Sequence, residues 1–200
     1  IRNNNVPLLR QWFNLLNKIP PENQAAVWLG TSETLAHILK TGSSLQAHAE
    51  YFHALEQAKN NQIVNQSHIK FILEAKDNDG IPGLNWALEN GHTQAVKTFL
   101  GALPKLGLTA GQIKDILEAK DNDGIPGLLM ALKNGRTDAV IAFLDALPKF
   151  ESPQLLTADQ ILEIAQANWR GTPGLALALE SGNPATIKAY CEGLKTLGLD

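Results

Sequence analysis

The stretch Ile72–Leu84, ILEAKDNDGIPGL, returns letter for letter as Ile116–Leu128, 44 residues later in the chain. The likeness extends over Ile72–Lys105 and Ile116–Lys149, here called the first and second copies, which agree at 26 of 34 positions. A period of this length indicates stacked supersecondary units, each too small to bury its own apolar face. We therefore expect the chain to work by presenting a long surface rather than by closing a catalytic pocket.

Two looser copies flank this pair. A third copy is marked by Gly171–Leu175, which aligns with Gly124–Leu128 at a spacing of 47 residues. The extra length falls in Phe150–Leu156, where we expect an expanded loop around a proline. A degenerate earlier copy is visible where Leu35–Gly42 mirrors Leu84–Gly91.

Each copy predicts three helices, of which the first two carry the clearest signals. Helix A begins after a Pro-Gly pair, as in Leu84–Asn90, and ends before Gly91, Gly135 or Gly182. A glycine just past a helix end adopts the left-handed conformation without a Cβ clash. Helix B carries apolar residues at i, i+3, i+4 and i+7, which is typical of a helix with one buried face. These positions hold Val96, Phe99, Leu100 and Leu103, then Val140, Phe143, Leu144 and Leu147, then Ile187, Tyr190, Cys191 and Leu194.

A short helix C is expected to follow helix B. It opens at Thr109–Gln112 and at Thr157–Gln160, which share the T-x-x-Q form of a capping box. In that motif the hydroxyl and the amide satisfy backbone groups that would otherwise lack partners. Helix C ends at an Asp-Asn-Asp-Gly turn signal, as in Asp77–Gly80, and the cycle restarts.

The composition excludes several classes of function. An apolar fraction of 44% and a charged fraction of 18% indicate a folded chain rather than a disordered one. A net charge of −3 with no basic run argues against nucleic acid or an anionic membrane surface as partner. No apolar stretch approaches the length of a membrane span, and no cleavable signal opens the chain. Cys191 is the single cysteine, so no internal disulfide can form.

These features resemble the ankyrin repeat, whose pattern runs Asp-x-x-Gly-x-Thr-Pro-Leu-His-x-Ala-Ala-x-x-Gly-His, followed by a second helix that ends in Leu-Leu. The matching residues of the first copy are Asp77–Gly80 for the turn, Leu84, Ala87, Gly91-His92 and the closing pair Phe99-Leu100. The resemblance covers roughly residues 22–200 and is specific in the two middle copies. It implies an all-α, ankyrin-like repeat solenoid with an extra short helix, helix C, in each repeat.

The chain departs from the family pattern in two places. The Thr-Pro pair is replaced by Pro-Gly, and the helix A histidine is replaced by Asn85, Leu129 and Ala176. We therefore expect the usual hydrogen bonds of that histidine to neighbouring turns to be absent.

The resemblance also implies how the chain is divided. The expected units are an N-terminal helix (1–21, a half-repeat or cap), a degenerate ankyrin-like repeat (22–70), two ankyrin-like repeats (71–115 and 116–162) and a C-terminal capping repeat (163–200). Because the chain starts at Ile1 rather than Met and begins inside a repeat, we expect it to be part of a longer protein.

The Gly-x-Pro-Gly-Leu variant with an inserted helix is also similar to the ankyrin tails of type III secretion effectors of enteric bacteria. The EspL/enterotoxin-like cysteine protease effectors are the nearest match, and the OspC-type effectors are a weaker second. In such proteins a catalytic domain lies upstream and the tail engages host proteins. The resemblance therefore implies a monomeric protein–protein interaction module with a host protein as partner. It is expected to carry no catalytic residue, metal or cofactor of its own, and to reach the host cell cytoplasm through a type III system.

In ankyrin stacks, the second, third and fifth turn positions and the two residues before the helix-ending glycine project into one groove. Carried over to this sequence, the expected partner-binding residues are Asn78, Asp79, Ile81, Glu89 and Asn90, then Asn122, Asp123, Ile125, Lys133 and Asn134, then Trp169, Arg170, Thr172, Glu180 and Ser181. Their apolar members would form an anchor inside a polar rim. The eight positions that differ between the first two copies leave the helix B stripe unchanged, so we expect this variation to lie mostly on exposed faces.

Three other interpretations compete with this one. Asp77–Gly80 could open a calcium loop, but the register would place Ala75 and Trp86 at ligand positions, so a structural turn is favoured. Cys191 could be the nucleophile of a hydrolase, but its place on the helix B stripe favours a small buried core residue. The array could also be a structural or self-associating repeat protein.

Overall fold

The protein is predominantly helical in a computed structural model that describes residues 34–42, 45–152 and 155–199 and the isolated residues 11, 15 and 18. Within these residues the sheet content is one pair of two-residue strands. The predicted all-α class is therefore confirmed. The expected N-terminal helix over residues 1–21 falls outside the described residues, apart from those isolated positions.

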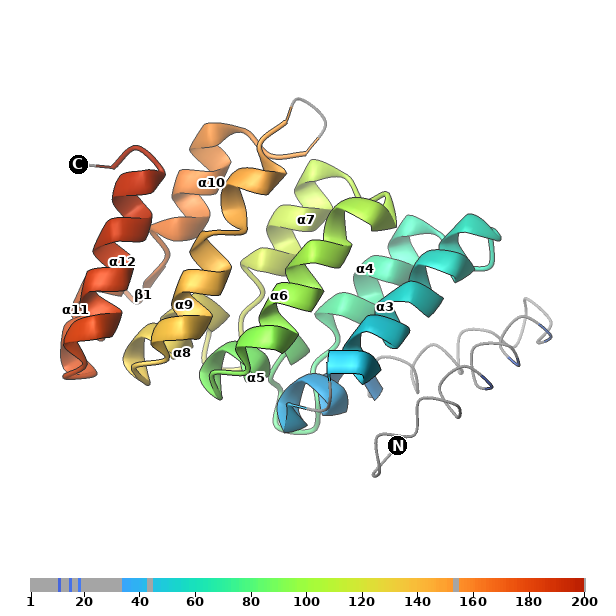
Figure 1. The fold of residues 1–200 in the computed structure, drawn as a ribbon, viewed down its shortest axis with the longest axis horizontal. Coiled ribbons are helices and arrows are strands. Elements are labelled where there is room, and N and C mark those ends of the chain that lie inside the picture. The colour runs from blue at the N-terminus through green and yellow to red at the C-terminus, as the bar shows by residue number, and fades with distance from the viewer. Residues whose placement is uncertain are drawn as a thin grey trace.

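The helices lie in three rows, and consecutive members of each row are in contact (Figure 1). Row A contains the helix of residues 34–41, α5 (Gly83–Glu89), α8 (Gly127–Lys133) and α11 (Gly174–Glu180). Row B contains α3 (Leu45–Asn60), α6 (Thr93–Ala102), α9 (Thr137–Leu144) and α12 (Pro184–Thr196). Row C contains α4 (Gln66–Glu74), α7 (Ala110–Leu117) and α10 (Ala158–Ala165). The remaining elements are the short 3-10 helices η2 (Leu103–Leu106) and η3 (Leu147–Phe150) and the strands β1 (Asn168–Trp169) and β2 (Thr172–Pro173).

Row B and its 3-10 extensions bury the predicted apolar stripe. Val96, Phe99, Leu100 and Leu103 are at most 1% exposed, and their counterparts in the second copy are at most 2% exposed. Burying a side chain of this size contributes roughly 1.5–3 kcal/mol. Both stripes are confirmed, and they belong to one cluster of buried residues that links the copies.

The prediction for the third stripe is wrong in part. Ile187 and Leu194 are only half-buried, and Cys191, expected in the core, is exposed. In the second copy this position holds Leu144, whose side chain contacts the place where a Cβ on Gly193 would stand. The position therefore faces the next helix of row B. No described helix lies beyond α12, so the Cys191 side chain is left open to solvent (Figure 1).

The predicted helix ends are confirmed. Gly91, Gly135 and Gly182 follow the row A helices with φ of 73°, 64° and 66°, where a side chain would be strained. Helices α7 and α10 both begin with a complete capping box, formed by Thr109 with its glutamine and by Thr157 with its glutamine. Such a cap contributes about 1 kcal/mol.

The side chain of the residue directly after each of these glycines is hydrogen-bonded to the backbone of the preceding copy. The hydrogen-bonded pairs are His92 with the Lys40 carbonyl (3.2 Å), Arg136 with the Glu89 carbonyl (2.8 Å) and Asn183 with the Gly135 carbonyl (3.0 Å). The same three side chains lie over Gly42, Gly91 and Gly135, within 2.6–3.2 Å of where a Cβ would stand. Position 92 differs between the first two copies, where it holds the half-buried His92 and the exposed Arg136.

Position 85 is an exception to the expectation that the positions that differ between the copies lie mostly on exposed faces. Asn85 is 2% exposed and its counterpart Leu129 is fully buried. Asn85 Nδ2 donates to the carbonyl of Ala119 at 2.9 Å and to that of Ile125 at 3.4 Å. These carbonyls flank the turn of the next copy, so the expected loss of hydrogen bonds to a neighbouring turn is wrong at this residue.

Leu144→Ala and Cys191→Ala form a matched pair, because the two residues share one position in successive copies. Leu144 is 2% exposed, so its truncation should lower the unfolding free energy by about 2–5 kcal/mol. Cys191 is exposed, so its truncation should change the unfolding free energy by less than about 0.5 kcal/mol. Urea unfolding followed by circular dichroism measures both, and equal losses would contradict the open position of Cys191.

Candidate protein-binding surface

The predicted binding residues lie on the turns that lead into row A and at the ends of the row A helices. In the first turn, Asp77 Oδ1 accepts hydrogen bonds from the backbone N–H groups of Asp79 (2.9 Å) and Ile81 (3.2 Å). Asp121 organises the second turn in the same way, at 2.9 and 2.8 Å. These bonds support the structural-turn interpretation over the calcium interpretation, because one oxygen of each aspartate is already used by its own turn.

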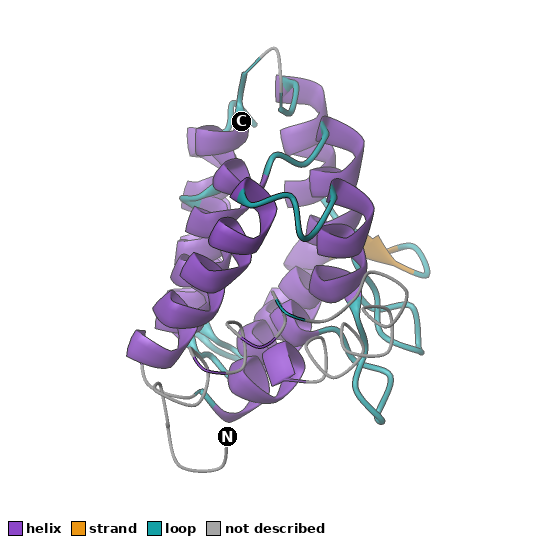
Figure 2. Cartoon of the chain, turned by 90° about the vertical axis from the view of Figure 1, so that its right-hand side faces the viewer, coloured by secondary structure: helices purple, strands orange, loops and turns teal. Residues whose placement is uncertain are grey.

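The third turn is a two-stranded ribbon in which Trp169 pairs with Thr172. Asn168 stands at the position of the two organising aspartates. Arg170 has a left-handed backbone with φ of 52° and is exposed, while Trp169 is half-buried. The ribbon projects beyond the helices, on a side where neighbouring loops also project (Figure 2).

The predicted residues fall into two groups by exposure. The exposed group is Asn78, Asp79, Asn90, Asn122, Asp123, Lys133, Asn134, Arg170 and Glu180. The half-buried group is Ile81, Glu89, Ile125, Trp169, Thr172 and Ser181. Ile125 and Trp169 also pack against the core, so only part of each side chain is open to a partner.

A lysine from the preceding row A helix occupies the first turn. Lys40 Nζ lies 3.1 Å from Asp77 Oδ2, 2.7 Å from Asp79 Oδ2 and 4.0 Å from the centre of the Trp86 ring. The indole Nε1 of Trp86 donates to Asp77 Oδ2 at 2.8 Å. We call these four residues the first station. Lys40 and Trp86 are absent from the predicted set because no sequence motif links Lys40 to partners 37 and 39 residues away.

The pKa values of the first station follow from these contacts. Burial alone would raise the pKa of Asp77, but bonds from Lys40, the Trp86 indole and two backbone N–H groups hold it below its ordinary value of 3.8. The hydrogen bond to Asp79 is the main cause that raises the pKa of Lys40 above 10.5. Both partners of the Lys40–Asp77 pair are therefore charged at neutral pH.

The third turn carries a cluster of opposite character, which we call the last station. The centre of the Trp169 ring lies 5.0 Å from the guanidinium carbon of Arg170 and 5.9 Å from Lys133 Nζ. The indole Nε1 donates to the backbone carbonyl of Asp123 at 3.1 Å. Cations this close to an aromatic ring gain about 0.5–1 kcal/mol at exposed sites. This end of the surface therefore combines positive charge with a ring held in place.

The second turn lacks the two groups that donate to Asp77 in the first turn, the Lys40 ammonium and the Trp86 indole. Glu89 stands at the position equivalent to Lys40, and Met130 stands at the position equivalent to Trp86. Asp121 is 8% exposed, and its Oδ2 receives no hydrogen bond from any described residue. Glu89 Oε2 is buried and also lacks a partner within the described ranges.

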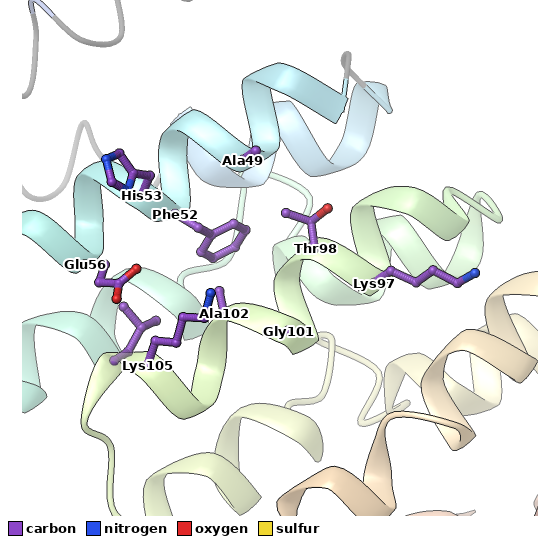
Figure 3. Close-up of a pocket in the computed structure, with 10 residues that line it drawn as sticks. Ala49, Phe52, His53, Glu56, Lys97, Thr98, Gly101, Ala102 and Lys105 are labelled. Atoms are coloured by element: carbon purple, nitrogen blue, oxygen red, sulfur yellow. The ribbon is translucent and has the colours of Figure 1, made fainter.

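Two grooves lie along row B, away from the stations. One has a volume of about 340 Å³ and lies between α3 and α6, where Phe52, His53, Glu56, Lys97 and Lys105 line it (Figure 3). The other has a volume of about 440 Å³ and lies between α6 and α9. Because a groove recurs between consecutive row B helices, we attribute both to the packing of the row rather than to a dedicated pocket.

The exposed Cys191 thiol has no imidazole beside it in the described part of the chain. The last histidine in the sequence is His92, the N-cap of α6, and α9 lies between α6 and α12. Among the described residues, no helix combines the length and the apolar character needed to cross a membrane. Neither the models of known protein families nor the curated proteins match this chain.

Asp77→Asn tests the first station through its pH dependence. The pKa of Asp77 is lower in the folded protein than in the unfolded chain, so its ion pair stabilises the fold above about pH 4 and stops doing so as the pH falls through the folded value. The variant should therefore be less stable than the parent by about 1 kcal/mol near neutral pH, and the difference should shrink as the pH falls through the folded pKa of Asp77.

Melting temperatures of both proteins across this pH range measure the difference. Asp123→Asn is the matched control, because Asp123 is exposed and its carboxylate forms no ion pair with a described residue. A gap between Asp77→Asn and the parent that stays constant down to the lowest pH would show that the ion pair with Lys40 does not stabilise the turn.

Proposed function

We propose that this chain is an ankyrin-like repeat solenoid that recognises another protein through its row of turns. The observation that carries the proposal is that neighbouring copies are joined by the same kind of contact while their turns present different side chains. The joining contacts are those of His92, Arg136 and Asn183. A common frame with variable exposed groups is what a recognition surface requires, and a catalytic pocket does not need it.

The chemistry of the surface supports the same function. Trp169 and Arg170 belong to the residue types enriched in binding hot spots. Half-buried Ile81 and Ile125 can contribute apolar contact area, and exposed acids and amides surround them. An interface of ordinary size buries about 800 Å² on each partner, an area that we expect three adjacent turns to provide.

The resemblance to the tails of type III secretion effectors extends this proposal to a biological setting. In that setting the partner is a host protein, the module is monomeric, and it acts in the host cell cytoplasm beside an upstream catalytic domain. The likeness of the Gly-x-Pro-Gly-Leu turns and the inserted helix supports this part.

Two other functions have less support. A cysteine-dependent hydrolase needs a base next to Cys191, and the described residues provide no imidazole there. A self-associating repeat protein would form dimers or larger species, which sedimentation analysis would detect directly.

Charge reversal on the turns tests the proposal. The variant combines Asp79→Lys, Asp123→Lys and Arg170→Glu, and we expect it to lose capture of partner proteins from host-cell lysate. The matched control combines Lys97→Glu, Asp145→Lys and Lys149→Glu, three exposed residues along the row B grooves, and should capture as well as the parent. Each charge reversal at an interface changes affinity by several-fold or more, so the triple variant should lose at least about tenfold.

Circular dichroism and melting of both variants separate loss of binding from loss of fold. Capture that survives the turn variant and disappears in the row B variant would move the binding surface to row B. Capture that survives both would contradict recognition through either face.

A further inference from the structure

The outer side of the third copy exposes residues whose counterparts the earlier copies bury. Rows A and B, with the 3-10 extensions of row B, contain five positions that are at most 2% exposed in both the first and the second copy. In the third copy, Leu175 and Leu179 of α11 are 41% and 58% exposed, and the three positions on α12 are half-buried or exposed. We call the five residues of the third copy the end face. The five positions hold Leu84, Leu88, Val96, Leu100 and Leu103 in the first copy, Leu128, Leu132, Val140, Leu144 and Leu147 in the second, and Leu175, Leu179, Ile187, Cys191 and Leu194 in the third.

The end face keeps an apolar character that a capping copy does not have. Terminal copies of stacked arrays present a polar outer face to water. Four of the five residues of the end face are aliphatic, and the fifth is a cysteine. Large apolar side chains that are exposed together on one face indicate an interaction site, whereas single ones are ordinary. The end face is therefore the unoccupied continuation of the interface that joins one copy to the next.

The contacts of the second copy show what fits such a face. Leu132 Cδ1 lies 3.0 Å from where a Cβ on Gly174 would stand, at the start of α11. Leu144 lies against the place of a Cβ on Gly193, within α12. Each aliphatic side chain is therefore received by a glycine of the following copy, one at the start of the row A helix and one in the row B helix.

The segment that follows row B in the third copy repeats the segment that leads from row B to row C in the first. Leu106–Leu108 and Leu197–Leu199 are both Leu-Gly-Leu, and their central glycines have φ of 69° and 92°. In the first copy the next residue is Thr109, the N-cap of α7, and Asp200 stands at the equivalent position. Aspartate and threonine are both preferred N-cap residues. This recurrence predicts entry into another row C helix, from which the path leads to the next turn and the next row A helix.

We propose that the end face binds one further copy of the same repeat, entered through Leu197–Leu199. The row A helix of that copy opens with a glycine against Leu179, and its row B helix places a small residue against Cys191. The inference goes beyond the proposed function, because it concerns the end of the rows and does not depend on what the turns bind. Its consequence for recognition is a fourth turn beside the third, so the row of turns continues past Trp169 and Arg170.

A second molecule of this chain fits the end face less well. In the register of the earlier copies, the incoming row A helix opens with glycine, as α5 does at Gly83. The helix of residues 34–41 opens instead with Thr34 at the equivalent position. Two end faces placed against each other would oppose leucine with leucine and would reproduce none of the leucine–glycine contacts between copies. Self-association is therefore kept as an outcome that the experiment detects.

The test appends a second copy in the register that Leu-Gly-Leu sets. The extended chain consists of residues 1–199 followed by residues 109–150, so that the junction has the same sequence as the natural passage from row B to α7. The appended copy offers Gly127 to Leu179 and Ala146 to Cys191, by the alignment of the copies. It contains no cysteine, so Cys191 remains the single thiol.

Two measurements report docking of the appended copy. Alkylation of Cys191 under native conditions should slow by at least about tenfold, because its position becomes buried as that of Leu144 is. The melting temperature should rise by at least about 5 °C, since Leu175 and Leu179 lose their exposed apolar area. Circular dichroism should show a gain in helical signal from the appended residues.

Two variants make the test specific. Leu179→Glu should change the melting temperature of the unextended chain by less than about 1 °C, because Leu179 is exposed there. In the extended chain the same change should return Cys191 alkylation to its rate in the unextended chain, because docking would bury the carboxylate. Gly127→Leu in the appended copy alone should have the same effect, because the new side chain would fill the space that Leu179 needs.

Every outcome decides for or against the further copy. Unchanged alkylation of Cys191, no gain in helical signal, or protection that survives both variants would each overturn it. Sedimentation of the unextended chain as a dimer that Leu179→Glu converts to a monomer would assign the end face to a second molecule and would overturn it too. If the appended copy fails to dock while charge reversal on the turns still abolishes partner capture, the proposed function stands with three turns. If the appended copy docks while the turn variant captures normally, the proposed function alone fails.

Discussion

The close approach of consecutive row A helices at a glycine is the constraint on which the rest of the structure depends. A Cβ on Gly83 would lie 2.7 Å from the Leu39 side chain, and one on Gly127 would lie 2.7 Å from Asn85 Oδ1 and 3.1 Å from its Cα. A larger residue at either position would therefore force the neighbouring side chain to move and would press against the backbone of the preceding helix. Because these glycines immediately follow the turns, the spacing of the helices also sets the spacing of the turns.

This spacing explains why a residue in one copy can complete the turn of the next. Lys40 reaches Asp77 and Asp79 because its own helix is held against the following one. Lys133 lies beside the Trp169 ring for the same reason. The residue two positions before the helix-ending glycine therefore decides whether the next turn is neutralised, as by Lys40, or left acidic, as with Glu89.

The sequence predicted the features that depend on local signals, and missed those that depend on a neighbouring copy. The helix-ending glycines and the capping box at Thr109 follow rules that operate within a few residues, and the structure confirms them. The burial of Cys191 is predicted from its alignment with Leu100 and Leu144, although the position is covered only when another helix of row B follows it. The bonds of Asn85 to the next turn, and the contact of Lys40 with Trp86, join residues with no shared motif.

The comparison of the two near-identical copies also shows where specificity can arise in such a surface. Their turns have the same sequence from Asp77 to Ile81 and from Asp121 to Ile125, and they form the same backbone hydrogen bonds. The differences that change the stations lie instead in the helix that follows each turn and in the helix that precedes it. Replacing a donating indole by Met130 and an ammonium by Glu89 converts a neutralised turn into an acidic one without altering its shape. In the first two turns, the electrostatic character is thus set by residues outside the loop, whereas the third turn carries its own cation in Arg170.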